Sequence, residues 1–147
     1  FLAFLGTAAA WGYPRYMEKN PFPPNIQTNS QVQLFYPNKL PPGFEVDKTK
    51  MHFANGALIY DAKKADLRLV FTLQKTPPNY NYTNFYQQDL KNLQDLNSPY
   101  GKAVVGRYQD RVLGSLVSGN TWLLLSTNST SVTNDDMSLV ISNLKKY

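Results

Sequence analysis

Hydrophobic and polar residues alternate in several short segments of the chain, as they do in β-strands that have one buried face. The clearest run covers Leu67–Gln74, and a similar one covers Gln31–Pro37. Asn55-Gly56 lies between two apolar stretches and predicts a two-residue hairpin turn. Further strands are predicted where short apolar runs end at turn residues, at 44–47, 51–53, 57–60, 103–107, 112–117 and 121–126.

Two other segments have apolar residues at helical spacing. The first helix is predicted over 83–96, with Thr83 as its N-cap and with an apolar stripe of Tyr86, Leu90, Leu93 and Leu96. The second is predicted to begin after Thr133, because Thr133 and Asp136 have approximately the spacing of a capping box. Its stripe consists of Met137, Val140, Ile141 and Leu144, and it ends at two lysines, Lys145 and Lys146.

The links between successive predicted strands are short, which favours antiparallel pairing. Both helices must bury their apolar stripes, and packing them on one face of a single sheet achieves this. We therefore predict an α+β domain over residues 31–147, with a single antiparallel sheet and two amphipathic helices on one face. Leu69 and Leu93 are then both buried, and replacing either by Ala is expected to cost about 2–5 kcal/mol.

The chain begins with an apolar segment, Phe1–Tyr13, which stops at Pro14-Arg15. As a helix it would be about 20 Å long, whereas the hydrocarbon core of a membrane is about 30 Å thick. We predict that residues 1–17 form a membrane anchor or assembly segment through the side chains of Phe1, Leu2, Phe4, Leu5, Trp11 and Tyr13. Residues 18–30 contain three prolines and are predicted to form an extended spacer.

Three interpretations of this apolar segment remain open, besides burial in the core. It is the outer part of a transmembrane anchor, with Trp11 and Tyr13 at the interface. Alternatively, it is the end of a secretory signal, since Ala8–Ala10 fits a small-residue cleavage site. The third interpretation is a filament subunit, because a chain that starts at Phe1 resembles processed type IV pilins, although they carry a glutamate where this chain has Leu5. All three place the folded domain outside the cytoplasm.

Composition excludes several chemistries. The sequence contains no cysteine and one histidine, so one chain has no disulfide, thiolate nucleophile or Cys/His zinc site. The net charge is +5, but the 15 basic residues are spread along the chain and form no nucleic-acid-binding motif. We therefore expect weak attraction to anionic polymers or lipid headgroups, and no nucleic-acid partner.

Several short motifs together are similar to those of a known class of proteins. These are Tyr36-Pro37, the turn Leu40–Phe44, the segment Gly101–Gly106, Gly119-Asn120-Thr121-Trp122 and the last helix, Thr133–Leu144. Their arrangement resembles single-pass bacterial envelope proteins with an extracytoplasmic α+β domain and, more distantly, the PsbP-like fold. The resemblance covers about 110 residues, rests on packing and turn positions, and implies a fold rather than a function.

Residues that could carry out chemistry are few. His52 is flanked by Met51 and Phe53 in a predicted strand, and it is expected to face solvent or one polar partner. Asp135 and Asp136 are expected to stabilise a helix N-terminus. No phosphate-binding loop, dinucleotide fingerprint, nucleophile elbow or zinc-protease motif occurs. We therefore expect a non-enzymatic protein without cofactor or metal.

The most unusual segment is the loop Thr76–Tyr86, which is rich in Tyr and Asn. Rigid aromatic side chains in such loops often contact a partner, so Tyr80, Tyr82, Phe85 and Tyr86 are predicted to bind a protein or a glycan of the cell envelope. In the alternative interpretation, these aromatics only fold the loop against the edge of the sheet. The predicted function is a membrane-anchored, extracytoplasmic binding or scaffolding protein, and the alternative is a filament subunit that polymerises through residues 1–17.

Overall fold

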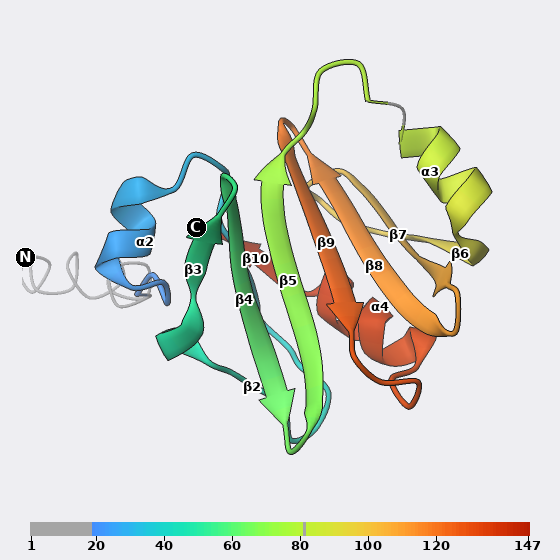
Figure 1. Ribbon diagram of the computed structural model, residues 1–147, viewed down its shortest axis with the longest axis horizontal. Helices are drawn as coiled ribbons and strands as arrows, with labels where there is room; N and C mark the ends of the chain where they lie inside the picture. The colour runs from blue at the N-terminus through green and yellow to red at the C-terminus, as the bar shows by residue number, and fades with distance from the viewer. Residues whose placement is uncertain (1–18, 81) are drawn as a thin grey trace, which may run out of the picture.

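The computed structural model describes residues 19–80 and 82–147 (Figure 1). The predicted anchor, residues 1–17, lies outside the described residues, and so do the six side chains assigned to it. Within the described ranges, no helix is both long enough and apolar enough to cross a membrane. The fold is α+β, as the sequence predicts, and its main sheet is antiparallel.

In the described part of the chain, eight strands form the main sheet. Seven follow one another in the order β2-β4-β5-β9-β8-β7-β6, and β3 also pairs with β4. Asn55 and Gly56 both have positive φ (52° and 82°), which confirms the tight hairpin between β3 and β4. The strands are β2 (Glu45–Val46), β3 (His52–Ala54), β4 (Ala57–Lys64), β5 (Leu67–Lys75), β6 (Lys91–Leu96), β7 (Lys102–Tyr108), β8 (Arg111–Ser118) and β9 (Thr121–Thr127).

One face of this sheet carries the main core, and we call it the core face. Leu69, Phe71 and Leu73 of β5 are completely buried there, which confirms the alternation seen in the sequence. The opposite face, which carries Val104, Leu113 and Leu124, is called the outer face. Because successive residues of a strand point to opposite faces, the two faces have separate sets of side chains.

Helix α4 (Asn134–Ser142) packs on the core face over β7 and β8. The Thr133 side chain accepts a hydrogen bond from the Asp136 N–H, and Asp136 Oδ2 accepts one from the Thr133 N–H, so the predicted capping box is confirmed. Met137, Val140 and Ile141 are buried. Gly114 allows this close packing, because a Cβ at that position would lie 2.8 Å from Ile141 Cγ1.

The predicted C-terminal end of this helix is wrong. The helix stops at Ser142, and Leu144–Lys146 form β10, which pairs with β1 (Phe35–Pro37) in a separate two-stranded sheet. Asn143 leaves the helical conformation, and its N–H donates to the Val140 carbonyl. Pairing with β1 then buries Leu144, which the sequence pattern had placed on the helical stripe.

The first predicted helix is correct only in its first half. Helix α3 covers Tyr82–Asp89, so Thr83 lies inside its first turn and is not its N-cap. Residues 91–96 form the edge strand β6 and pair with β7, with an irregular register between Lys91 and Gln94. Leu93 is 42% exposed, which contradicts the prediction that it is buried. If the helix continued, the backbone groups at the edge of β7 would have no strand partner. Pairing of residues 91–96 with β7 makes these hydrogen bonds.

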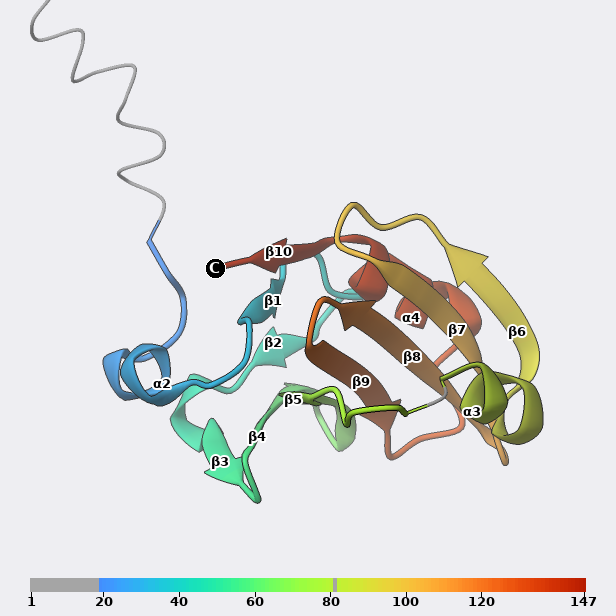
Figure 2. The same ribbon diagram turned by 90° about the horizontal axis from the view of Figure 1, so that it is seen from above.

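The two predicted helices do not share a face of the sheet. Helix α4 packs on the core face, whereas Tyr86 of α3 and Leu90, which follows the helix, pack against Val104 on the outer face. Figure 2 shows the two helices on opposite sides of the sheet. The prediction of one common face is therefore wrong. The physical reason is that β7 and β8 carry apolar residues on both faces, and each face needs a cover.

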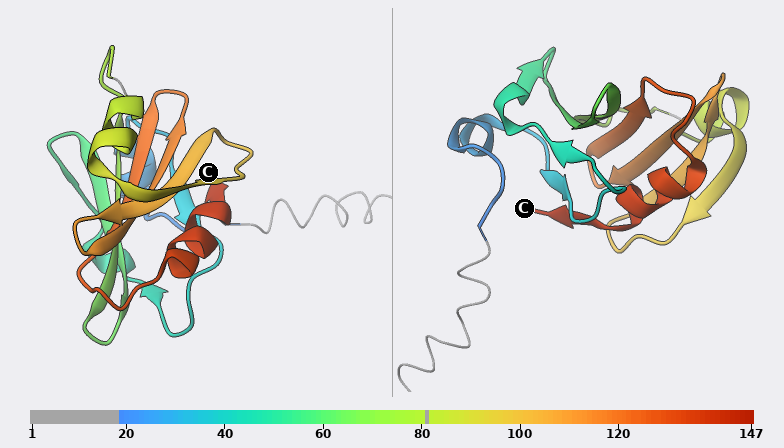
Figure 3. Two further views of the ribbon diagram at one scale, coloured as in Figure 1. Left: turned by 90° about the vertical axis from the view of Figure 1, so that its right-hand side faces the viewer. Right: turned by 90° about the horizontal axis from the view of Figure 1, so that it is seen from below.

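The proline-rich segment is not an extended spacer where the structure describes it. Helix α2 covers Pro24–Asn29, and Phe22 and Ile26 are almost completely buried in the main core. The Phe22 ring contacts Tyr60 edge-on, with centroids 5.8 Å apart. Helix α2 lies at the opposite end of the molecule from α3 (Figures 1 and 3). The core thus extends to residues before 31.

Candidate functional site

The aromatic loop predicted as a binding site folds onto the outer face at the start of β9. Tyr80 is 38% exposed, and its ring centroid lies 5.0 Å from that of Trp122. Phe85 of α3 meets the same Trp122 ring edge-on at 5.8 Å. Tyr86 is buried, and the side chain of Tyr82 lies outside the described part. The loop therefore uses some of its aromatics for packing and leaves Tyr80 accessible, with Phe85 half-buried.

A buried serine anchors this arrangement to the sheet. Ser115 of β8 is completely buried, and its Oγ accepts a hydrogen bond of 3.0 Å from Trp122 Nε1. Its Oγ also shares a 2.8 Å hydrogen bond with the Tyr86 hydroxyl. Since the indole N–H can only donate, Ser115 acts as acceptor for Trp122 and remains able to donate to Tyr86. These two bonds join α3, β8 and β9, and they position Phe85 above the outer face.

An apolar groove lies between α3 and the strands beside it. It encloses about 300 Å³ and is lined by Phe85, Asp89, Tyr108, Leu113 and Leu124. The two leucines are half-buried, and Tyr108 is 44% exposed. Tyr86 of α3 packs with Val104 of β7, but the helix has only eight residues and leaves these outer-face side chains of β8 and β9 open on one side. We call these five residues the α3 groove.

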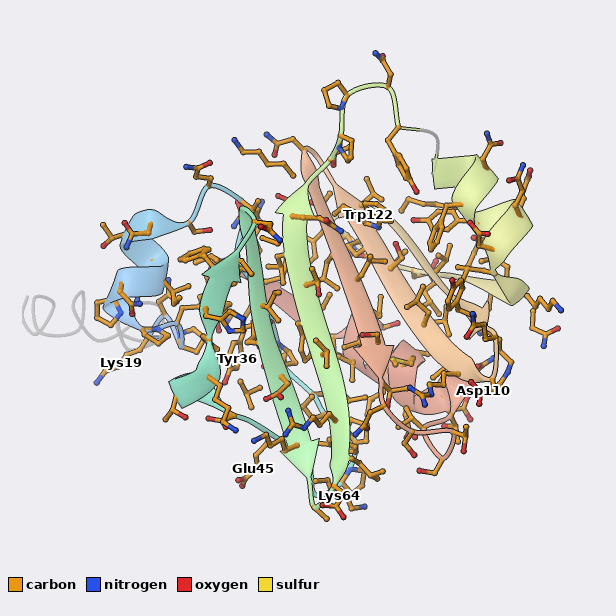
Figure 4. All side chains as sticks on the ribbon, viewed as in Figure 1. Lys19, Tyr36, Glu45, Lys64, Asp110 and Trp122 are labelled. Atoms are coloured by element: carbon orange, nitrogen blue, oxygen red, sulfur yellow. The ribbon has the colours of Figure 1, made fainter. Side chains whose placement is uncertain are left out.

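A second, more polar pocket of about 310 Å³ shares Tyr108 and Leu113 with the α3 groove. It is formed by the β7–β8 turn, where Arg107 Nη2 donates to the Asp110 carbonyl at 2.7 Å. The Arg111 Nε and a carboxylate oxygen of Asp110 are 3.8 Å apart. Trp122 and Asp110 are labelled in Figure 4 and lie toward opposite ends of the outer face. The two cavities together form a surface that is apolar near α3 and polar near the turn.

His52 and Asp136, which the sequence analysis considered for chemistry, both take part in local hydrogen bonds. His52 is exposed, and its Nδ1 lies 2.9 Å from the Lys50 carbonyl oxygen, which agrees with a solvent-facing histidine that has one polar partner. Asp136 completes the capping box. Among the residues that the structure describes, no three His, Asp or Glu side chains come together as a metal site would require.

Sequence reasoning missed most of the α3 groove. Leu113 and Leu124 belong to strands that were predicted from short apolar runs, without an assignment of their faces. A signal was present, because Trp122–Leu125 is an uninterrupted apolar run, which is typical of a strand covered on both faces. The position of Tyr108 depends on the β7–β8 turn, for which no pattern in the sequence predicts a groove.

Neither the protein-family models nor the curated proteins contain a match to this chain. The resemblance to the PsbP-like fold therefore stays a prediction.

Proposed function

We propose that this protein is a non-enzymatic binding or scaffolding domain, anchored to a membrane by residues 1–17 and located outside the cytoplasm. It binds a protein partner of the cell envelope through the α3 groove. The observation that carries the proposal is this groove of about 300 Å³, in which Phe85, Leu113 and Leu124 form apolar walls. Accessible apolar concavities of this kind are typical of recognition sites.

The lining of the groove favours a protein segment over a glycan. Its volume is at the lower limit for small-molecule sites, so it suits one apolar side chain of a partner. Asp89 and the Tyr108 hydroxyl supply its polar side-chain groups, whereas a glycan requires many hydrogen-bond partners. No Lys or Arg lies within ion-pair distance of Asp89 in the ranges 19–80 and 82–147. We infer a partner that places an apolar side chain in the groove and a basic one beside Asp89.

A selection from a random peptide library displayed on phage tests the groove. The full-length protein is expected to enrich peptides in which an apolar residue lies close to Lys or Arg. Tyr108→Ala removes an exposed wall of the groove, so it should abolish this enrichment. Asp89→Asn keeps the shape but removes the charge, so the apolar preference should remain and the basic preference should disappear.

The matched control for the first variant is Phe53→Ala, which also truncates an exposed aromatic residue but lies on β3, away from the groove. It should select the same peptides as the unmodified protein. Enrichment of the same sequences by Tyr108→Ala, or a selection without any common apolar position, would contradict binding in this groove.

The anchoring role depends on the apolar pattern of residues 1–13 and is tested separately. The full chain should sediment with phosphatidylcholine vesicles, and a variant with Leu2→Asp and Leu5→Asp should remain in solution, since charged residues partition poorly into hydrocarbon. Equal sedimentation of the two would refute the anchor. Ordered fibres of the full chain in electron micrographs, absent from the same variant, would instead support the filament alternative.

A further inference from the structure

A third pocket lies on the outer face at the side remote from α3, between β3, β4 and β5. It encloses about 230 Å³. Ile59 and Val70 form its apolar walls, and the ionisable side chains at its rim are Lys50, His52, Asp61 and Arg68. Lys50 comes from the short 3-10 helix Lys48–Lys50 that precedes β3. The pocket is thus built from four consecutive elements of the chain, and we call it the β3–β5 pocket.

Cations are crowded beside this pocket. Lys63 of β4 pairs directly with Arg68 of β5, although like charges in cross-strand pairs are unfavourable. Each has one carboxylate as a partner: Lys63 Nζ lies 3.4 Å from Asp47 Oδ2, and Arg68 Nη1 lies 3.2 Å from Asp61 Oδ2. One oxygen of each carboxylate is therefore engaged by a cation, whereas Asp61 Oδ1 is buried and has no hydrogen-bond partner among the described residues.

Lys50 is the third cation of the cluster. Within the ranges that the structure describes, no carboxylate lies within 4 Å of its ammonium group. The neighbouring Lys63 lowers the pKa of Lys50 through side-chain contact and through its charge. Three cations thus face two carboxylates, and their mutual repulsion would be relieved by an anion placed between them.

The hydrogen-bond donors at the rim match those that bind oxyanions. Arg68 uses Nη1 for Asp61, and its guanidinium, with a side chain that is 47% exposed, has further N–H groups that face solvent. Lys50 is exposed and contributes an ammonium group with three donors. Asp61 is buried below Arg68 and holds the guanidinium in position. We propose that the β3–β5 pocket binds a phosphate group between Lys50 and Arg68.

Two sources could present such a group, namely a free phosphate or phosphate ester and the headgroup of an anionic phospholipid. Both offer oxygens that accept charge-assisted hydrogen bonds from ammonium and guanidinium groups. His52, the one histidine of the sequence, lies at the rim of the same pocket and acts as a site-specific reporter. Its Nδ1 donates to the Lys50 carbonyl, because a carbonyl oxygen can only accept, and this contact links the ring to the segment that carries Lys50.

The first experiment follows the His52 ring protons by NMR while inorganic phosphate is added to the full chain in detergent at constant pH and ionic strength. We expect a saturable shift. Lys50→Gln should raise the phosphate concentration needed for half of the shift about 10-fold, since a hydrogen bond to a charged group contributes on that scale. Lys75→Gln is the matched control, because it removes an equal exposed charge at the far end of β5 and should change this concentration less than about twofold.

The second experiment separates the two sources. Sedimentation of the full chain is compared on phosphatidylcholine vesicles with and without phosphatidylglycerol. If inorganic phosphate gives no shift, but phosphatidylglycerol increases binding for the unmodified protein and Lys75→Gln and not for Lys50→Gln, then the headgroup is the source. The proposal is overturned if neither probe binds, or if Lys50→Gln and Lys75→Gln behave alike. Because Tyr108 and Asp89 lie outside this pocket, failure here leaves the α3 groove untouched.

Discussion

Replacing Leu69 and Leu93 by Ala separates two leucines that the sequence pattern treats as equivalent. Leu69 is completely buried in β5, opposite Ala62 of β4 and Thr127 of β9. Its truncation removes three carbon atoms, which contribute about 2.4 kcal/mol at about 0.8 kcal/mol for each buried methylene. The cavity that remains adds to this, so the expected loss of unfolding free energy is about 3–5 kcal/mol. Leu93 is 42% exposed on the edge strand β6, and its truncation should cost less than about 0.5 kcal/mol.

Urea unfolding, followed by tryptophan fluorescence and circular dichroism, measures both values on the full chain. For a chain of this length, 1 kcal/mol corresponds to about 2–4 °C in melting temperature, so Leu69→Ala should melt about 6–20 °C lower. Leu93→Ala should melt within about 2 °C of the unmodified protein. A cost above about 2 kcal/mol for Leu93→Ala would refute the edge strand, because it would show that residues 90–96 bury Leu93 as a helix would. Equal costs for the two variants would refute the assignment of faces.

Three further variants test the core and the support of the α3 groove. Gly114→Ala places a Cβ 2.8 Å from Ile141 Cγ1 and should cost about 1–3 kcal/mol in urea unfolding, with part of the loss recovered when Ile141→Ala is added. Ser115→Ala removes the acceptor for Trp122 Nε1 and should cost about 1–3 kcal/mol while changing the Trp122 emission; an unchanged urea midpoint would contradict the anchoring role. Burial raises the pKa of Tyr60 well above 10, so the unfolded chain loses this proton first and stability should fall from about pH 10 upward. Unfolding at a series of pH values should show a smaller alkaline loss for Tyr60→Phe.

Local patterns were sufficient wherever neighbouring residues determine the structure. The alternation along β5 follows directly from burial on one face, and Asn55-Gly56 forms a turn because both residues accept positive φ. The Thr133 cap is also a local property, since its bonds join residues three positions apart. These elements were predicted with nearly correct bounds.

Two of the wrong predictions involve strand pairing, which hydrophobic spacing alone does not reveal. Residues 90–96 have a helical pattern, but the unpaired edge of β7 draws them into β6. Leu144 fits the stripe of α4, but β1, more than 100 positions earlier in the chain, pairs with its segment. Hydrophobic spacing shows which residues avoid water, and it does not show which backbone supplies the hydrogen bonds. The apolar run Trp122–Leu125 indicates a strand covered on both faces, but the α3 groove itself could not be predicted from local spacing, because its walls come from α3, β7, β8 and β9.

The distribution of covering elements explains why both proposed sites lie on the same face. The core face is closed by α4 on one side, and Phe22, just before α2, and Ile26, within α2, join the same cluster. The side chains of the core face therefore contribute to the stability of the fold. On the outer face, α3 covers only the region near β7. It leaves the outer face of β5 and β9 uncovered, where Thr72 and Leu124 are cross-strand partners. Val70 in the β3–β5 pocket and Leu124 in the α3 groove thus belong to adjacent strands, and binding at either site requires no opening of the core.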